Sequence, residues 1–169
     1  MNKQNDTPAV PEALVIERSF KAPRELVWKA WTDPERLMRW SAPESFTTPV
    51  YNLELRVGGR YLSCMRSPEG KDYWSTGVYR EIIVPERLVC SDGFADPQGN
   101  PVPAAYYGMP GDWPEQLLVT ITLEERQGGT HLTLAQAGLP ASEREEARKG
   151  WNGSFDKLAA LLAHEQAHG

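Results

Sequence analysis

The C-terminal segment constrains the fold most, because it is long and carries its apolar residues on one side. Residues 143–166 place apolar side chains at steps of three and four, which predicts one amphipathic helix about 36 Å long. Ser142 and Glu145 form the S-x-x-E pattern of a capping box at its start. A helix of that length crosses a whole domain. Its apolar stripe consists of Ala147, Trp151, Phe155, Leu158 and Leu162.

The same helix contains two glycines, Gly150 and Gly153. Each is expected to cost the helix on the order of 1 kcal/mol relative to alanine. Two explanations are open. Either a sheet packs close to the helix backbone at these positions, or the small residues leave space beside Trp151.

The middle of the chain is a series of strand signals joined by short turns. Apolar and polar residues alternate in each segment, and the turns contain Gly or Pro. Consecutive strands with short connections predict an antiparallel meander, and the lack of long helices between them argues against a doubly wound parallel sheet. The predicted strands are Tyr51–Val57, Arg60–Arg66, Lys71–Val84, Arg87–Phe94, Gln116–Arg126 and Thr130–Ala137.

The N-terminal part supplies a further strand and two short helices. Residues 1–12 are polar and rich in proline, which predicts a disordered tail before a single domain at 13–166. Apolar residues alternate from Leu14 to Phe20, as in a strand. Pro23 suits the first turn of a helix, and Asp33 caps a second helix that ends near Trp40.

Length and charge exclude several classes of protein. A chain of 169 residues suits one domain and can bury about 70% of the surface that its unfolded form exposes. The net charge of -5 and the scattered basic residues argue against a nucleic-acid partner. No apolar run approaches the roughly 18 residues of a membrane span, and the N-terminus lacks the apolar core of a signal peptide. We therefore expect a cytoplasmic protein without a membrane partner, in which Cys64 and Cys90 are reduced.

A set of short motifs recurs in a characteristic order between Ala13 and Ala163. They are Ala22-Pro23, Val27-Trp28, Ala30-Trp31, Asp33-Pro34, Trp40, Leu55 to Arg60, and Gly150-Trp151. In this order and spacing the chain resembles the Hsp-90 ATPase activator homologues of the START-like (SRPBCC, Bet v 1-like) superfamily. The resemblance implies an α+β helix-grip fold, in which a curved antiparallel sheet wraps around the long C-terminal helix and often leaves a ligand cavity.

Large aromatic residues are the candidates to line such a cavity. Their rings provide apolar surface, and the N–H or O–H groups of Trp and Tyr can orient a ligand. The alternative is that they fill the core. We predict a small hydrophobic or amphipathic partner bound by Trp40, Tyr61, Trp74, Tyr79, Phe94, Trp151, Phe155 and Leu158.

The connection from Asp96 to Glu115 is unusually long for a loop in a compact domain. Loops of this length are commonly lids, binding loops or disordered segments. Its apolar residues favour a lid over one opening of the cavity, ahead of a patch for a protein partner or a homodimer, and ahead of plain surface packing. The predicted lid residues are Tyr106, Tyr107, Met109 and Trp113.

Catalytic and metal-binding patterns are weak. His131, His164 and His168 show no metal-ligand spacing with a third ligand, and no motif for a cofactor is present. The inward polar candidates are Arg18, Gln136 and the tyrosines, with no well-placed carboxylate; Arg18 and Gln136 point into a cavity or lie at the rim of the sheet. We therefore expect a binding protein without enzymatic activity. The alternatives are a cyclase- or aromatase-like enzyme that uses the same cavity, and a chaperone-associated interaction module.

Overall fold

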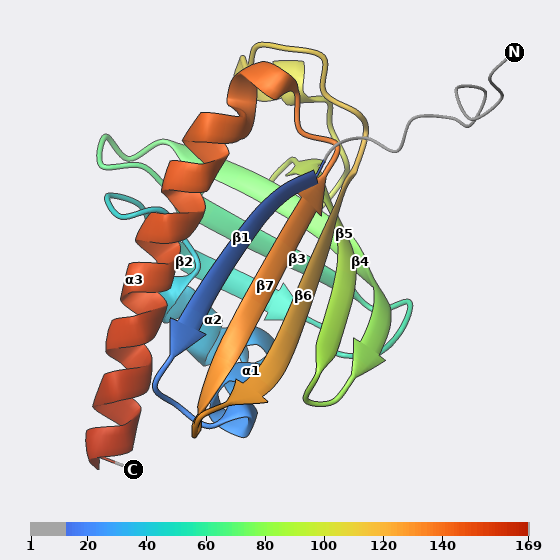
Figure 1. Ribbon diagram of the computed structural model, residues 1–169. Helices are drawn as coiled ribbons and strands as arrows, with labels where there is room; N and C mark the ends of the chain where they lie inside the picture. The colour runs from blue at the N-terminus through green and yellow to red at the C-terminus, as the bar shows by residue number, and fades with distance from the viewer. Residues whose placement is uncertain (1–12, 169) are drawn as a thin grey trace, which may run out of the picture.

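The computed structural model describes residues 13–168 as a seven-stranded antiparallel sheet and three α-helices (Figure 1). The sheet order is β1-β7-β6-β5-β4-β3-β2. This confirms the predicted α+β architecture, whereas the predicted tail, residues 1–12, lies outside the described residues. The strands are β1 (Ala13–Phe20), β2 (Thr47–Leu53), β3 (Arg60–Arg66), β4 (Asp72–Ile83), β5 (Arg87–Ala95), β6 (Leu117–Arg126) and β7 (Gly129–Ala137).

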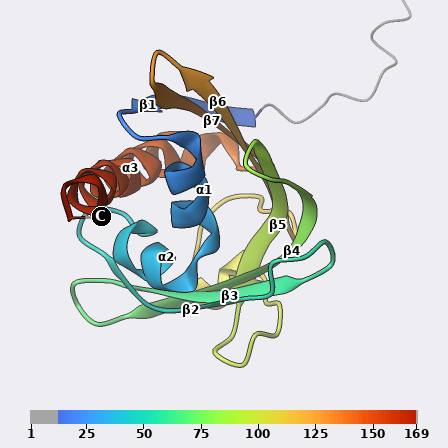
Figure 2. The same cartoon turned by 90° about the horizontal axis from the view of Figure 1, so that it is seen from below.

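The helices lie inside the curve of the sheet, as Figure 2 shows. The two short helices between β1 and β2 begin where the sequence predicts. Pro23 immediately precedes the first helix. At the start of the second helix, the Asp33 side chain accepts a hydrogen bond from the Glu35 N–H at 3.3 Å. The α-helices are α1 (Arg24–Thr32), α2 (Pro34–Trp40) and α3 (Arg144–His168), and the short 3-10 turns are η2 (Ala104–Tyr107) and η3 (Ala141–Glu143).

β2 differs from the prediction at both ends. It runs from Thr47 to Leu53 rather than from Tyr51 to Val57, and the side chains of Leu55 and Val57 are 41% and 62% exposed. The chain turns away after Leu53 because residues 54–59 form a loop in which the Gly58 N–H donates to the Tyr79 carbonyl at 2.8 Å. Alternation in the sequence does not distinguish this loop from a strand.

The start of α3 also differs in detail. The Ser142 hydroxyl donates to the Glu143 carboxylate at 3.4 Å, and η3 leads into a helix that begins at Arg144. The predicted capping box of Ser142 and Glu145 is therefore replaced by a 3-10 turn. Within residues 13–168, no helix combines the length and the apolar character needed to cross a membrane.

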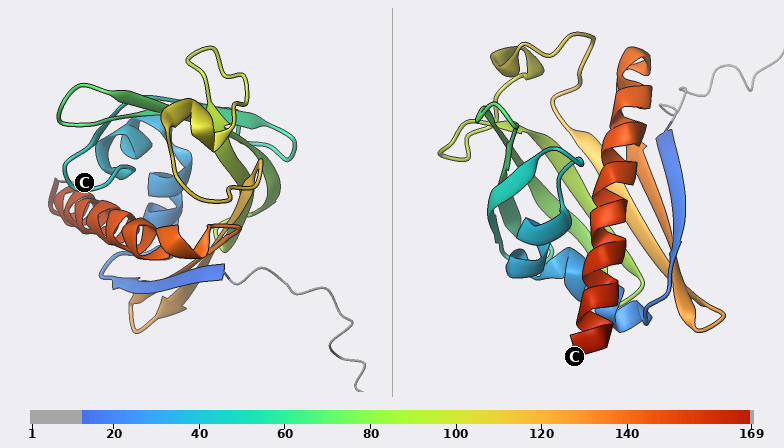
Figure 3. Two further views of the ribbon diagram at one scale, coloured as in Figure 1. Left: turned by 90° about the horizontal axis from the view of Figure 1, so that it is seen from above. Right: turned by 90° about the vertical axis from the view of Figure 1, so that its left-hand side faces the viewer.

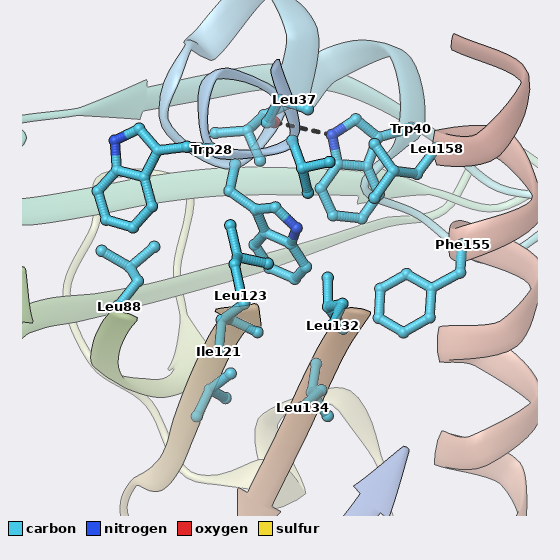
Figure 4. Packing of buried hydrophobic residues seen from close by; sticks show 14 of the residues in the cluster. Trp28, Leu37, Trp40, Leu88, Ile121, Leu123, Leu132, Leu134, Phe155 and Leu158 are labelled. Carbon is cyan, nitrogen blue, oxygen red and sulfur yellow. Dashed lines mark hydrogen bonds between the residues drawn. The ribbon is translucent and has the colours of Figure 1, made fainter. Parts of the chain in front are cut away.

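The core lies between α3, the short helices and the strands β6 and β7. Phe155 and Leu158 are 0% exposed, and Figure 4 shows them directed toward Trp40 and Leu132. The Phe155 ring packs within 6.2 Å of the Trp31 and Phe20 rings. The stripe predicted from the sequence is therefore the face of α3 that the sheet covers.

The two helix glycines meet a loop rather than the sheet. A Cβ at Gly153 would lie 2.9 Å from the backbone nitrogen of Glu44, and one at Gly150 would lie 3.5 Å from Cγ of Pro43. Lys157 fixes this loop to the helix, since its ammonium donates to the carbonyls of Pro43 and Phe46 at 2.8 and 2.7 Å. Close packing is therefore the correct explanation for Gly153, and its packing partner is the connection between α2 and β2.

We expect alanine to have opposite effects at the two glycines. Gly150→Ala should stabilise the fold by up to about 1 kcal/mol, because its Cβ makes an ordinary contact and alanine favours the helix. Gly153→Ala should destabilise it, because its Cβ overlaps the backbone of Glu44. Urea denaturation of both variants and the wild type measures the difference, and stabilisation by Gly153→Ala would contradict this packing.

Candidate functional site

The concave face of the sheet carries one continuous row of residues across five strands. Strand pairing aligns Leu14, Gln136, Val119, Cys90 and Tyr79, from β1 to β4. Trp151 of α3 contacts this row, since its indole N–H donates to the Gln136 side-chain oxygen at 2.9 Å. A buried polar side chain needs such a partner, and this bond places Trp151 over β7, which neighbours the edge strand β1.

A carboxyl group lies on the same face, two residues along β5 from Cys90. Asp92 shares its side of the strand with Cys90, and the Tyr61 hydroxyl donates to Asp92 Oδ1 at 2.5 Å. The Tyr61 ring stacks on Tyr51 with centroids 5.9 Å apart and lies 6.1 Å from the Tyr79 ring. We call Tyr51, Tyr61, Tyr79 and Asp92 the tyrosine–aspartate cluster.

Gly77 of β4 makes the bond between Tyr61 and Asp92 possible. Tyr61 lies on β3 and Asp92 on β5, so the tyrosine ring must cross β4 to reach the carboxyl. A Cβ at Gly77 would lie 2.5 Å from Cε2 of Tyr61 and 1.8 Å from the Ser91 carbonyl oxygen. Only glycine leaves room for this crossing.

Burial dominates the electrostatics of the cluster. It raises the pKa of Asp92 from 3.8 to about 6, and the hydrogen bond from Tyr61 opposes that rise. Burial also raises the pKa of Tyr51 and Tyr61 well above 10, and that of the Cys90 thiol to about 12. At neutral pH, Asp92 is therefore the group of this cluster that ionises.

The cluster borders accessible space, although it faces inward. Tyr51, Cys90 and Asp92 are half-buried, so each keeps some accessible surface. Among the described residues, Asp92 Oδ2 has no hydrogen-bond partner. It is not fully buried, so this oxygen keeps accessible surface. The same holds for the amide nitrogen of Gln136. Both polar atoms therefore keep some accessible surface, and we call the accessible surface of Tyr51, Cys90, Asp92 and Gln136 on the concave face the hollow.

A cleft, which we call the loop cleft, lies against the long connection between β5 and β6; Figure 3 shows the course of that connection at one end of the sheet. The volume of the cleft is about 740 Å³, and Met109 and Trp113 of the predicted lid line it together with Leu139 and Arg144. Leu117 adjoins both regions. It pairs with Asp92, and it lies 3.0 Å from a Cβ position on Gly138, which lines the cleft.

Tyr107 attaches the long connection to the sheet. Its hydroxyl accepts a hydrogen bond from the Trp74 N–H at 3.1 Å and donates to the Ala95 carbonyl at 2.6 Å. Trp113 packs edge-on against Phe94 with centroids 5.4 Å apart. Tyr106, by contrast, is 56% exposed. The long connection thus contacts the sheet through Tyr107 and Trp113. Its role as a lid stays a prediction.

The predicted ligand-binding residues do not form one group. Trp40, Phe155 and Leu158 lie in the packed core, with at most 1% of their surface exposed. Trp74 lies on the opposite face of β4 from Tyr79, as the strand register shows. The role of these four residues in ligand binding stays a prediction, but the structure separates them from the hollow.

The other four predicted residues lie on the concave side. Tyr61 and Tyr79 belong to the tyrosine–aspartate cluster, and Trp151 contacts the row of residues on the concave face at Gln136. Phe94 continues the inward side of β5 beyond Asp92 and packs under the long connection.

Asp92 corrects the expectation that no carboxylate faces the interior. The signal was present in the sequence, because Leu88, Cys90, Asp92 and Phe94 alternate on one side of β5. Arg18 lies at the edge of the sheet, where it forms an ion pair with Asp156 of α3. Gln136 is instead a buried residue held by Trp151.

A second polar group, on the outer face of β1 and β7, resembles a catalytic triad in composition. His131 Nε2 lies 2.8 Å from Glu17 Oε1, and its Nδ1 lies 3.2 Å from the Ser19 hydroxyl. In a Ser-His-Asp triad, Nε2 faces the serine and Nδ1 faces the carboxylate, whereas here Nε2 faces the carboxylate and Nδ1 faces the serine. The group also lies outside the loop cleft. We therefore interpret it as a cross-strand hydrogen-bond network.

The curved antiparallel sheet around a long C-terminal helix defines the helix-grip fold of START-like proteins. Within that class, the chain belongs to the family described as Activator of Hsp90 ATPase homolog 1-like protein, whose family model matches residues 21–163. No curated protein matches the chain.

Solved structures support the same placement. A protein from Chromobacterium violaceum is 31% identical, with a TM-score of 0.75, and the match covers 89% of this chain and 96% of that one. A protein from Mycobacterium smegmatis is 27% identical, with a TM-score of 0.73 and coverage of 89% and 90%. An AHSA1 protein from Silicibacter pomeroyi is 26% identical, with a TM-score of 0.71 and coverage of 90% and 99%.

The raised pKa of Asp92 predicts a pH-dependent stability difference. The native protein keeps the Asp92 proton up to about pH 6, whereas the unfolded chain releases it near pH 3.8. The free energy of unfolding of the wild type therefore falls as the pH rises between these two values. One pKa unit corresponds to about 1.4 kcal/mol. The free energy of unfolding of Asp92→Asn should therefore exceed that of the wild type by up to about 3 kcal/mol at neutral pH, and the two should be equal near pH 4.

Urea denaturation across this pH range measures the difference between the two proteins. Tyr61→Phe provides a comparison, because it removes the hydroxyl that lowers the pKa of Asp92 and should move the loss of stability to higher pH. A difference between Asp92→Asn and the wild type that stays constant with pH would show that Asp92 is not desolvated in solution.

Proposed function

We propose that this protein binds a small amphipathic molecule on the concave face of the sheet, between the tyrosine–aspartate cluster and Trp151. The observation that carries the proposal is that two polar atoms, Asp92 Oδ2 and the amide nitrogen of Gln136, face accessible space inside an otherwise apolar sheet. Unpaired polar groups are costly in an interior, and a bound ligand would supply their partners.

The surroundings match the composition of a small-molecule site. Leu117 and Val119 form an apolar floor between the polar positions, and the Trp151 indole lies above it. Asp92 lies on β5 and Gln136 on β7, two strands away and two residues further along, so the two positions are about 12 Å apart. A ligand with one or two rings and a polar group at each end fits this arrangement.

The loop cleft provides the opening in this proposal. Its lining contains Met109, Trp113 and Leu139, and Leu117 separates it from Asp92. A ligand would pass beneath the connection between β5 and β6 and displace the Leu117 side chain to reach the cluster.

A pair of variants tests where ligands bind. Cys90→Phe should fill the hollow and reduce binding at least about tenfold, because Cys90 faces the accessible space. Leu118→Phe places the same ring on the outer face of β6 and should leave binding unchanged. Native mass spectrometry and thermal shift against amphipathic amines, alcohols, acids and polyketides supply the ligands. Equal losses in both variants, or binding that survives in Cys90→Phe, would place the ligand elsewhere.

Acid–base catalysis at the same site is the second candidate function. The observation that favours it is a pKa of about 6 for Asp92, which lets the carboxyl both donate and accept a proton near neutral pH. If the protein turns over a ligand that it binds, Asp92→Asn should abolish turnover while binding remains. Turnover that is equal in wild type and Asp92→Asn would exclude this role.

A further inference from the structure

The carboxyl of Asp92 is desolvated without a cation to compensate its charge. Burial and the hydrogen bond from Tyr61 are the two influences on its protonation, and no basic side chain of the described residues contributes. Interior carboxylates are ordinarily paired, because an isolated charge in low-dielectric surroundings is strongly disfavoured. The free oxygen, Oδ2, faces the hollow, so the missing partner would have to come from within it.

The rings around Asp92 add to the preference for positive charge. Tyr51 and Tyr61 lie near enough for the negative charge of Asp92 to raise the pKa of both hydroxyls. Tyr79 completes the group, with its ring 6.1 Å from that of Tyr61. Aromatic faces attract cations, most strongly where water is excluded. A carboxylate among three tyrosine rings therefore disfavours anions and favours an organic cation.

We propose that the ligand of this protein carries a protonated amine, which binds Asp92 Oδ2 within the tyrosine–aspartate cluster. This inference rests on the proposed function and names the chemical class of the ligand. The amine donates a charge-assisted hydrogen bond to Oδ2, while Tyr61 keeps its bond to Oδ1 and holds the carboxyl in place. The apolar part of the ligand lies on Val119 beneath Trp151, and an acceptor at its far end meets the amide nitrogen of Gln136.

A metal ion does not fit the same position. Within residues 13–168, no group of three or more His, Cys, Asp or Glu side chains could hold a metal. Asp92 and Cys90 are the candidate ligands on this part of β5, and burial raises the pKa of the thiol to about 12, which opposes its conversion to a thiolate. The site is suited to an organic cation, which requires one carboxylate rather than a coordination sphere.

Three compounds of nearly equal size, which differ in their polar head group, test the preference for an amine. Isothermal titration of the full chain with 2-phenylethylamine, 2-phenylethanol and phenylacetate should show the amine binding about tenfold or more tightly than the others near pH 7.5, as expected for a charge-assisted hydrogen bond. Asp92→Asn should abolish this preference and leave the affinity for the alcohol within a factor of about three. Asp156→Asn, an exposed carboxylate on α3, should leave the amine affinity unchanged.

The pH dependence of amine binding is a second test. A purely structural role of Asp92 would not make the affinity for the amine depend on the protonation of its carboxyl. Amine binding should weaken as the pH falls from about 7.5 to about 5, because Asp92 is protonated there. The other titratable groups that face Asp92 are Tyr51, Tyr61, Tyr79 and Cys90, and burial raises the pKa of each, so they stay neutral over this range.

The outcomes distinguish this inference from the proposed function. If the alcohol or the acid binds as tightly as the amine, and Cys90→Phe blocks that binding, the hollow binds ligands but the inference of an amine is overturned. An amine affinity that Asp92→Asn leaves unchanged overturns it as well. If none of the three compounds binds, and the wider panel gives no binding sensitive to Cys90→Phe, both the inference and the proposed function fail.

Discussion

The fold depends on the burial of one face of α3 within the curve of the sheet. Phe155 and Leu158 are fully buried, and the surrounding rings of Phe20, Trp31 and Trp40 fill the space between the helix and the strands. The loop after α2 holds the helix from the other side, through the close approach of Glu44 to Gly153. With α3 placed in this way, the side chains of the protein itself fill the aromatic part of the interior.

The interior changes character toward β4 and β5. Polar groups replace the packed hydrocarbon, and they are joined in pairs, Tyr61 with Asp92 and Trp151 with Gln136. Each pair satisfies one atom and leaves another facing accessible space. The desolvated carboxylate weakens the fold at neutral pH, so its presence is understandable if it serves recognition or chemistry rather than stability. Family membership says which fold surrounds this site, and the site itself carries the functional proposal.

The sequence was sufficient for the architecture because local apolar periodicity and turn residues encode it. The stripe of α3, the succession of short turns and the cap at Asp33 each have a local signature, and the structure contains all three elements. Local patterns failed where tertiary contacts decide. Leu55 and Val57 alternate like strand residues but lie in a loop, and Gly153 is explained by a loop more than one hundred residues away in sequence.

The candidate site was harder to predict, because it depends on which side chains share the concave face. Parity along β5 places Asp92 beside Cys90, but only the register of β3, β4 and β5 shows that Tyr61 crosses Gly77 to reach it. Ring size alone does not separate Trp40, which fills the core, from Tyr79, which belongs to the tyrosine–aspartate cluster.

The state of the Asp92 carboxyl is the most direct measure of this account. Carbon-13 NMR of the side-chain carboxyl, assigned by comparison with Asp92→Asn, follows its titration in the free protein. A desolvated carboxyl at this position should titrate with a midpoint near 6, and the midpoint should move to lower pH when an amine binds. A midpoint near 3.8, the ordinary value for aspartate, would mean that the carboxyl is solvated and would contradict the buried recognition site.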